Sequence, residues 1–134
     1  MVSAESREYL RRLQETPGFG HDGFDLESLR AGMATRRPPT DPAVRCVPTD
    51  VVGMPGEWVL APDAEPDVRL LYLHGGGFVS GAGAFYLAMA AHLSTAGKCA
   101  VLLPDYRPAP EHPFPAALED CVRAHEWLRM NGPE

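Results

Sequence analysis

The chain has 134 residues, 45% of them hydrophobic and 22% charged, a composition typical of one globular domain or of a piece of a larger one. The formal net charge of −6 argues against nucleic acid and against an anionic membrane surface as the main partner. No apolar run is long enough to span a membrane, and the first residues lack the apolar core of a secretory signal. Cys46, Cys99 and Cys121 match no metal or disulfide spacing. We therefore expect a reduced, cytoplasmic protein without metal or cofactor.

Two helices are predicted at the start of the chain. Residues 3–15 have an amphipathic pattern, and residues 25–34 form a second, shorter helix with Asp25 as its N-cap. A polar, proline-rich connection, RRPPTDP, follows. We treat residues 1–42 as a helical N-terminal unit outside the sheet and residues 43–134 as a second unit.

From residue 43 onward the pattern changes to strands that alternate with helices. Two or three short strands within 43–61 surround a turn, GMPG, at 53–56. The next elements are an apolar strand at 68–74, a helix at 84–97 that ends near Gly97, a strand at 99–106 and a helix at 115–131. The predicted core stripe of the last helix is Leu118, Cys121, Val122 and Leu128. Strands that alternate with helices predict a parallel sheet with helices packed on its faces, an α/β fold.

A glycine-rich loop, HGGGFVSG, directly follows the strand at 68–74, and three chemistries use such a loop. Dinucleotide binding requires G-x-G-x-x-G; Gly75 and Gly77 fit, but Ser80 occupies the third position and Asp105 lies too far along the chain. A phosphate-binding P-loop requires a Gly-Lys-Ser/Thr ending, and the only lysine is Lys98. The third possibility is an oxyanion hole, in which backbone N–H groups stabilise the negative oxygen of an acyl-transfer transition state.

The glycines alone leave a simple turn without chemistry as an alternative. His74 also has two interpretations: it can fix the loop through hydrogen bonds to the backbone, or it can act in acid–base catalysis. We favour the first role because no carboxylate partner is adjacent in the sequence.

A second motif, PDYRPAPEHPFPAALEDC at residues 104–121, follows the next strand. Together with HGGGFVSG it strongly resembles the hormone-sensitive-lipase-like family of α/β-hydrolase esterases and lipases, over about residues 45–134. One position departs from the family's pattern, because Pro108 replaces leucine. The resemblance implies the N-terminal portion of a three-layer α/β-hydrolase fold. That portion would hold the cap helices, the first strands of an incomplete sheet, the oxyanion loop and two helices.

The resemblance also implies roles for single residues. Gly76 and Gly77 would supply oxyanion-hole N–H groups, His74 and Gly75 would shape the loop, and Phe78 would line the substrate cleft. Asp105, Arg107 and Glu111 would be structural. From the residue types alone, Arg107 and Glu111 could form a bidentate ion pair, and the alternative is a solvated surface pair.

An α/β-hydrolase also needs a serine on a G-x-S-x-G elbow, followed by an acid and a histidine. None of the five serines fits; Ser80, in G-x-x-S-G, has the wrong spacing. We therefore expect the nucleophile, acid and base to be missing from this chain, and we expect it to be inactive alone. An unpaired apolar edge strand would favour self-association or a complementing C-terminal half.

The implied function is hydrolysis of carboxylic esters, with a short-acyl, small-molecule substrate. Two alternatives remain open: a non-catalytic module that binds a small molecule, and the N-terminal partner of a split hydrolase.

Overall fold

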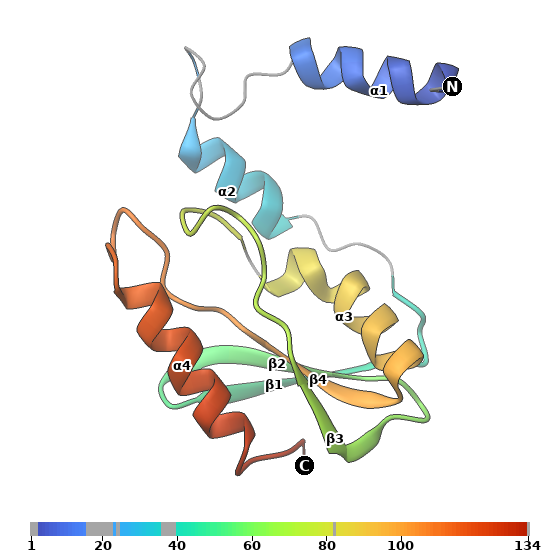
Figure 1. Ribbon diagram of the computed structural model, residues 1–134, viewed down its shortest axis with the longest axis vertical. Coiled ribbons are helices and arrows are strands. Elements are labelled where there is room, and N and C mark those ends of the chain that lie inside the picture. The colour runs from blue at the N-terminus through green and yellow to red at the C-terminus, as the bar shows by residue number, and fades with distance from the viewer. Residues whose placement is uncertain (1–2, 16–22, 24, 36–39, 82, 134) are drawn as a thin grey trace.

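The computed structural model describes residues 3–15, 23, 25–35, 40–81 and 83–133. Its centre is a four-stranded sheet with helix α3 (Gly83–Gly97) on one face and helix α4 (Ala116–Leu128) on the other (Figure 1). This layered arrangement confirms the predicted α/β class. The predicted parallel sheet is wrong in part, because two of the three strand pairs that the structure describes are antiparallel and only one is parallel. Among the described residues, no helix is long and apolar enough to cross a membrane.

Two helices precede the sheet, as predicted: α1 (Ala4–Glu15) and α2 (Leu26–Thr35). Asp25 caps α2, because its carboxylate accepts the backbone N–H groups of Glu27 and Ser28 at 3.1 and 3.2 Å. Residues 36–39 of the polar connection lie outside the described residues.

Strands β1 (Arg45–Val51) and β2 (Met54–Leu60) form an antiparallel hairpin. The predicted turn at 53–56 is wrong: the turn is Val52-Gly53, with φ of 57° and 82°. Positive φ at both central positions is typical of two-residue hairpin turns. The shift has a packing reason, since it buries Val51 and Met54 opposite each other and leaves Val52 exposed.

Strand β3 (Glu65–Leu71) and strand β4 (Cys99–Pro104) are parallel neighbours that are connected through α3, and the sheet order is β1-β2-β4-β3. β3 begins and ends three residues earlier than predicted, so His74 lies beyond the strand. Helix α3 ends at Gly97 as predicted, but the left-handed residue that follows its end is Lys98, with φ of 47°. The Lys98 carbonyl accepts the N–H of Glu65 at the start of β3.

The sheet carries a hydrophobic core on each face. Because successive strand side chains point to opposite faces, the fully buried β4 contributes to both. The core beneath α4 includes Trp58, Leu102, Tyr106, Ala124 and Leu128. The core beneath α3 includes Val59, Leu87, Ala90, Val101 and Leu103.

The predicted core stripe of α4 is largely wrong. Ala117, Asp120, Ala124 and Leu128 are the buried residues, whereas Leu118 and Val122 are 53% and 49% exposed. The ion pair with Arg107 fixes the orientation of α4, because it requires Asp120 to face inward. Only Leu128 of the predicted stripe is buried, and Cys121 is half-buried.

Ser94 joins α3 to the sheet through its buried hydroxyl, which donates to the Cys99 carbonyl at 2.6 Å and accepts the Ala61 N–H at 2.8 Å. Ser94→Ala would leave both backbone groups unsatisfied, so we expect a loss of roughly 1–3 kcal/mol in the free energy of unfolding. Urea denaturation of the full chain checks this. Thr95→Ala is the control, because that exposed residue's hydroxyl bonds only within its own helix to Ala91. Equal midpoints for the two variants would contradict the role of Ser94.

Candidate functional site

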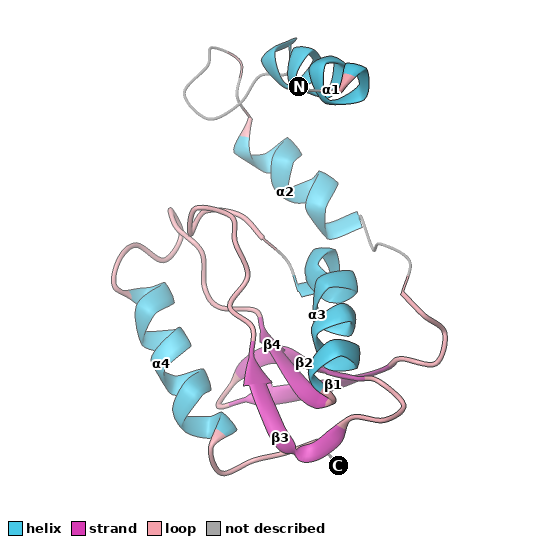
Figure 2. Ribbon diagram, turned by 45° about the vertical axis from the view of Figure 1, so that its right-hand side comes forward, coloured by secondary structure: helices cyan, strands magenta, loops and turns pink. Residues whose placement is uncertain are grey.

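Two loops meet at one end of the sheet. Because β3 and β4 are parallel, the loop after β3 (72–81) and the loop after β4 (105–115) leave the sheet at the same edge (Figure 2). Two hydrogen bonds join the loops. The Ala109 N–H donates to the Phe78 carbonyl at 2.8 Å, and the Tyr106 hydroxyl donates to the His74 carbonyl at 2.6 Å. The two sequence motifs therefore form one site.

The glycine loop folds into a tight turn around one carbonyl. The Gly76 oxygen accepts the N–H groups of Val79 at 3.2 Å and Ser80 at 3.0 Å. The two residues inside the turn, Gly77 and Phe78, have φ of 62° and 61°. Positive φ is rare for a bulky residue and is characteristic of functional sites. Gly76 itself leaves no room for a side chain, because an added Cβ would overlap the Ser80 carbonyl.

The turn leaves backbone donors unused. Within the part of the chain that the structure describes, neither the N–H of Gly76 nor that of Gly77 has a hydrogen-bond acceptor. Gly77 is exposed and Gly76 is half-buried. Adjacent N–H groups held by a rigid turn are the kind of donor that stabilises a developing negative charge.

His74 lies beneath this turn. Its ring is 5% exposed and stacks between Tyr106 and Tyr86, with centroid distances of 4.2 and 5.4 Å. Nδ1 lies 3.0 Å from the Gly75 carbonyl. The ring also excludes any side chain at Gly81, where an added Cβ would overlap it. These contacts suit a residue that shapes the loop.

Tyr106 completes this support. Burial raises the pKa of its hydroxyl to about 12, so the hydroxyl stays protonated and remains a donor to the His74 carbonyl. Ser80 is also engaged inside the loop: it is 3% exposed, and its hydroxyl donates to the Gly76 carbonyl at 2.9 Å.

Asp105 connects the second loop to α3. Its Oδ1 accepts the N–H of Gly83, the first residue of the helix, at 2.6 Å. A carboxylate at a helix N-terminus is stabilised by the helix dipole. The approach is close, because a Cβ on Gly83 would stand 2.9 Å from Oδ1.

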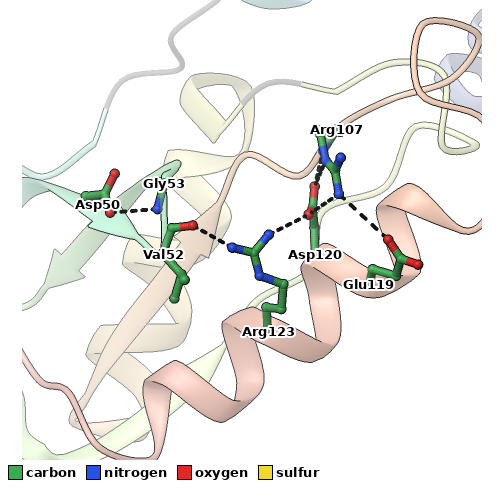
Figure 3. Close-up of polar contacts among 7 residues, drawn as sticks. All are labelled: Asp50, Val52, Gly53, Arg107, Glu119, Asp120 and Arg123. Atoms are coloured by element: carbon green, nitrogen blue, oxygen red, sulfur yellow. Dashed lines mark hydrogen bonds and ion pairs between the residues drawn. The ribbon is translucent and has the colours of Figure 1, made fainter.

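The expected pairing of Arg107 with Glu111 is wrong, because each residue has a different partner. Arg107 binds Asp120 through Nε and Nη2, both at 2.8 Å, and its backbone N–H adds a third bond to the same carboxylate (Figure 3). Arg123 lies 3.7 Å from Asp120 and donates to the Val52 carbonyl in the hairpin turn. The hydrogen bonds from Arg107 hold the pKa of the buried Asp120 below its ordinary value.

Glu111 pairs instead with Arg30, 81 residues away on α2, at 2.6 and 2.9 Å. This pairing lowers the pKa of Glu111 to about 2. The same guanidinium donates to the carbonyls of Val79 and Ala109, one in each loop. Arg30 thus belongs to the site, although no local signal marks it in the sequence.

Tyr106, Asp120 and Gly81 also contribute to the site and were not predicted from the sequence. Asp120 has a visible signal, an acid within an otherwise apolar helical stripe. Position 81 requires glycine because a side chain there would overlap the ring of His74, seven residues earlier in the chain.

An apolar groove of about 390 Å³ lies beside the glycine loop. Phe78, 61% exposed, forms part of its wall. The remaining lining residues are Leu73, Ala109, His112, Phe114, Pro115, Ala117, Leu118 and Cys121. The described residues contain no cluster of three or more His, Cys, Asp or Glu side chains able to hold a metal ion.

The sheet topology and the paired loops define the class of protein, an α/β-hydrolase fold. Residues 70–134 match the profile of the α/β-hydrolase fold family. The chain is 37% identical to a crystallised esterase/lipase from an uncultured bacterium, with a TM-score of 0.82 over 94% of this chain and 43% of that one. A second solved structure, an esterase from the bacterial hormone-sensitive lipase family, is 34% identical with a TM-score of 0.77, over 96% of this chain and 43% of that one.

Relatives compared by sequence alone lead to the same class of protein. The acetyl-hydrolase of Streptomyces hygroscopicus is 41% identical over 88 residues, which are 63% of this chain and 29% of the relative. Esterase LipI of Mycobacterium tuberculosis is 35% identical over 118 residues, which are 83% of this chain and 37% of LipI. The chain belongs to the hormone-sensitive-lipase-like family of α/β-hydrolases and spans less than half the length of these relatives.

Asp120→Asn tests the buried ion pair. It keeps the shape but removes the charge, and we expect a loss of about 1.5–3 kcal/mol in the free energy of unfolding at pH 7. The pKa of Asp120 is lowered in the folded state, so its contribution is fully present above the unfolded pKa of about 3.9 and is lost progressively as the pH falls from there through the folded pKa. Urea denaturation at pH 7 and pH 3 should show the difference between wild type and variant shrinking in acid. An undiminished difference at pH 3 would rule out an ionic origin.

Proposed function

We propose that this chain provides the oxyanion-stabilising part of a carboxylic ester hydrolase of the serine type. The observation that carries the proposal is the pair of unused N–H groups at Gly76 and Gly77, presented by a turn whose Gly76, Phe78 and Val79 carbonyls accept hydrogen bonds. Family membership supplies the reaction class, because the relatives include an acetyl-hydrolase and an esterase.

In this reaction a serine oxygen attacks the ester carbonyl carbon, and its proton passes to a histidine base. The carbonyl oxygen becomes negative as the tetrahedral intermediate forms. The N–H groups of Gly76 and Gly77 donate to that oxygen. The intermediate then collapses, the alcohol leaves with the proton, and water hydrolyses the acyl-enzyme. The groove beside Phe78 accommodates the apolar part of the substrate.

The nucleophile, the acid and the base come from outside this chain. No serine lies in a G-x-S-x-G elbow, and the serine hydroxyls have other partners in the described residues. Those partners are Ser6 for Ser3, Asp25 for Ser28, Gly76 for Ser80 and Cys99 for Ser94. The 134-residue chain alone is therefore not expected to hydrolyse esters, and a polypeptide that carries the elbow completes the site.

A short acyl chain is the proposed substrate class. The structure of the esterase EstE5, which is 37% identical, is of a crystal soaked with p-nitrophenyl butyrate. The groove of about 390 Å³ suits a small ester.

Gly76→Ala is the sharpest test of the oxyanion loop. The added methyl would overlap the Ser80 carbonyl and displace the turn that presents the two N–H groups. We expect a decrease in kcat of roughly 10²–10³-fold, the cost of losing one oxyanion donor. The measurement is hydrolysis of p-nitrophenyl butyrate by this chain complemented with a polypeptide bearing the serine elbow.

Gly32→Ala is the matched control, because that helical glycine of α2 has open space around it. Its kcat should equal that of the unsubstituted chain. Undiminished hydrolysis by Gly76→Ala would remove the loop from the mechanism.

One observation favours a chain that works with a partner or a second copy. Among the described residues, β3 pairs only with β4, and nearby apolar side chains on α4 are exposed. Open edges and apolar faces promote association. This supports self-association or a complementing half, including the split-hydrolase alternative.

We expect Leu118→Lys to reduce self-association, since Leu118 is 53% exposed on α4 beside the groove. The matched control is Leu10→Lys, because Leu10 is 52% exposed on α1, a helix that lies well away from α4 in Figure 1. Light scattering across a concentration series measures the mass of each. A monomeric unsubstituted chain, or equal masses for all three proteins, would count against the idea.

A further inference from the structure

Arg30 joins three segments that are distant in sequence. Its Nε donates to the Val79 carbonyl at 2.7 Å, and Nη2 donates to the Ala109 carbonyl at 2.6 Å. Nη1 and Nη2 donate to the two oxygens of Glu111. Helix α2 therefore contacts both loops through a single side chain, and Figure 1 shows α2 above them.

These hydrogen bonds connect the glycine turn, the proline-rich loop and α2 on the reverse side of the turn. The Phe78 carbonyl accepts the Ala109 N–H, and the next carbonyl, that of Val79, accepts Arg30. Ala109 also offers its carbonyl to the same guanidinium. Two consecutive carbonyls of the turn are thus fixed. Their peptide planes also carry the N–H groups of Val79 and Ser80, which donate to the Gly76 carbonyl, and the peptide plane of that carbonyl carries the Gly77 N–H.

Apolar burial contributes little to the placement of α2, because none of the residues of this helix is buried. A space of about 420 Å³ remains between α2 and α3, lined by Ser28, Leu29, Gly32, Met33 and Phe85. A helix that leaves such a gap gains less from burial than a closely packed one. The hydrogen bonds of Arg30 consequently account for much of the attachment of α2 to the loops.

We propose that Arg30 is a positioning residue that couples the placement of helix α2 to the geometry of the oxyanion turn. With α2 seated, Arg30 holds the carbonyls of Val79 and Ala109, and the turn presents its two N–H groups. When α2 moves away, both carbonyls lose their donor and the turn relaxes. This role rests on the proposed function, because the turn matters for rate only if it binds an oxyanion.

The geometry requires arginine rather than any cation. The guanidinium is a planar fork whose donors reach two backbone carbonyls and a carboxylate at once, whereas a lysine ammonium is a single point of charge. Lysine at position 30 keeps the attraction to Glu111 but cannot span all three acceptors. Arg30→Lys therefore separates the positioning role from simple charge pairing.

Amide hydrogen exchange tests the coupling without any substrate. In the full chain we expect Arg30→Lys to speed exchange at Val79, Ser80 and Ala109 by about tenfold or more, while β4 stays as protected as before. Arg7→Lys is the matched control on α1 and should leave all of these amides unchanged. The proposal is overturned if the loops exchange equally in wild type and Arg30→Lys. It is also overturned if the wild-type loops are already unprotected, or if protection of β4 falls as much as that of the loops.

Kinetics then separate this inference from the proposed function. In the complemented enzyme, Arg30→Lys should lower kcat for p-nitrophenyl butyrate by roughly 10–100-fold with little change in KM, as expected when reacting groups are misplaced. If Gly76→Ala impairs hydrolysis but Arg30→Lys does not, the inference fails and the function stands. If neither the wild type nor any variant hydrolyses the ester, but Arg30→Lys still speeds amide hydrogen exchange in the loops, the proposed function fails and the coupling by Arg30 stands.

Discussion

The parallel pairing of β3 with β4 is the constraint on which the rest of the structure depends. Parallel strands need a crossover, and α3 provides it across one face of the sheet. Parallel strands also end at the same edge, so the glycine loop and the proline-rich loop become neighbours. Had the strands been antiparallel, the two motifs would lie at opposite ends and no shared site would exist.

Around that edge, charged and polar side chains fix the shape of backbone that has no regular secondary structure. Asp105 bonds to the start of α3, Asp120 holds Arg107, and Tyr106 holds the His74 carbonyl. Each of these groups binds the main chain or a residue of a loop. They hold the loops in a fixed shape, which the glycines cannot do because they have no side chains to make contacts. Such rigidity is what electrostatic stabilisation of a transition state requires.

The layers, the strand and helix order and the two motifs could be predicted from the sequence, because they follow from local periodicity and from residues close together in the chain. The charge partners could not. Arg30 meets Glu111 across 81 residues, and Arg107 prefers Asp120 to the nearby Glu111. The turn at Val52 was missed because the burial of its neighbours overrides a valine's reluctance to adopt positive φ. The orientation of α4 was missed because Asp120 is buried only through its arginine partner.

Ala109 is hydrogen-bonded to Phe78, and Arg30 bridges the same two loops. The segment that could be swapped between related proteins is therefore larger than either loop alone. A transplant of residues 74–83 from a relative would arrive without the Ala109 N–H and the Arg30 guanidinium that bind its carbonyls. Recombination between family members should accordingly succeed when the glycine loop, the proline-rich loop and the arginine of α2 travel together. For protein engineering, the smallest interchangeable module here is a set of three separate stretches of sequence.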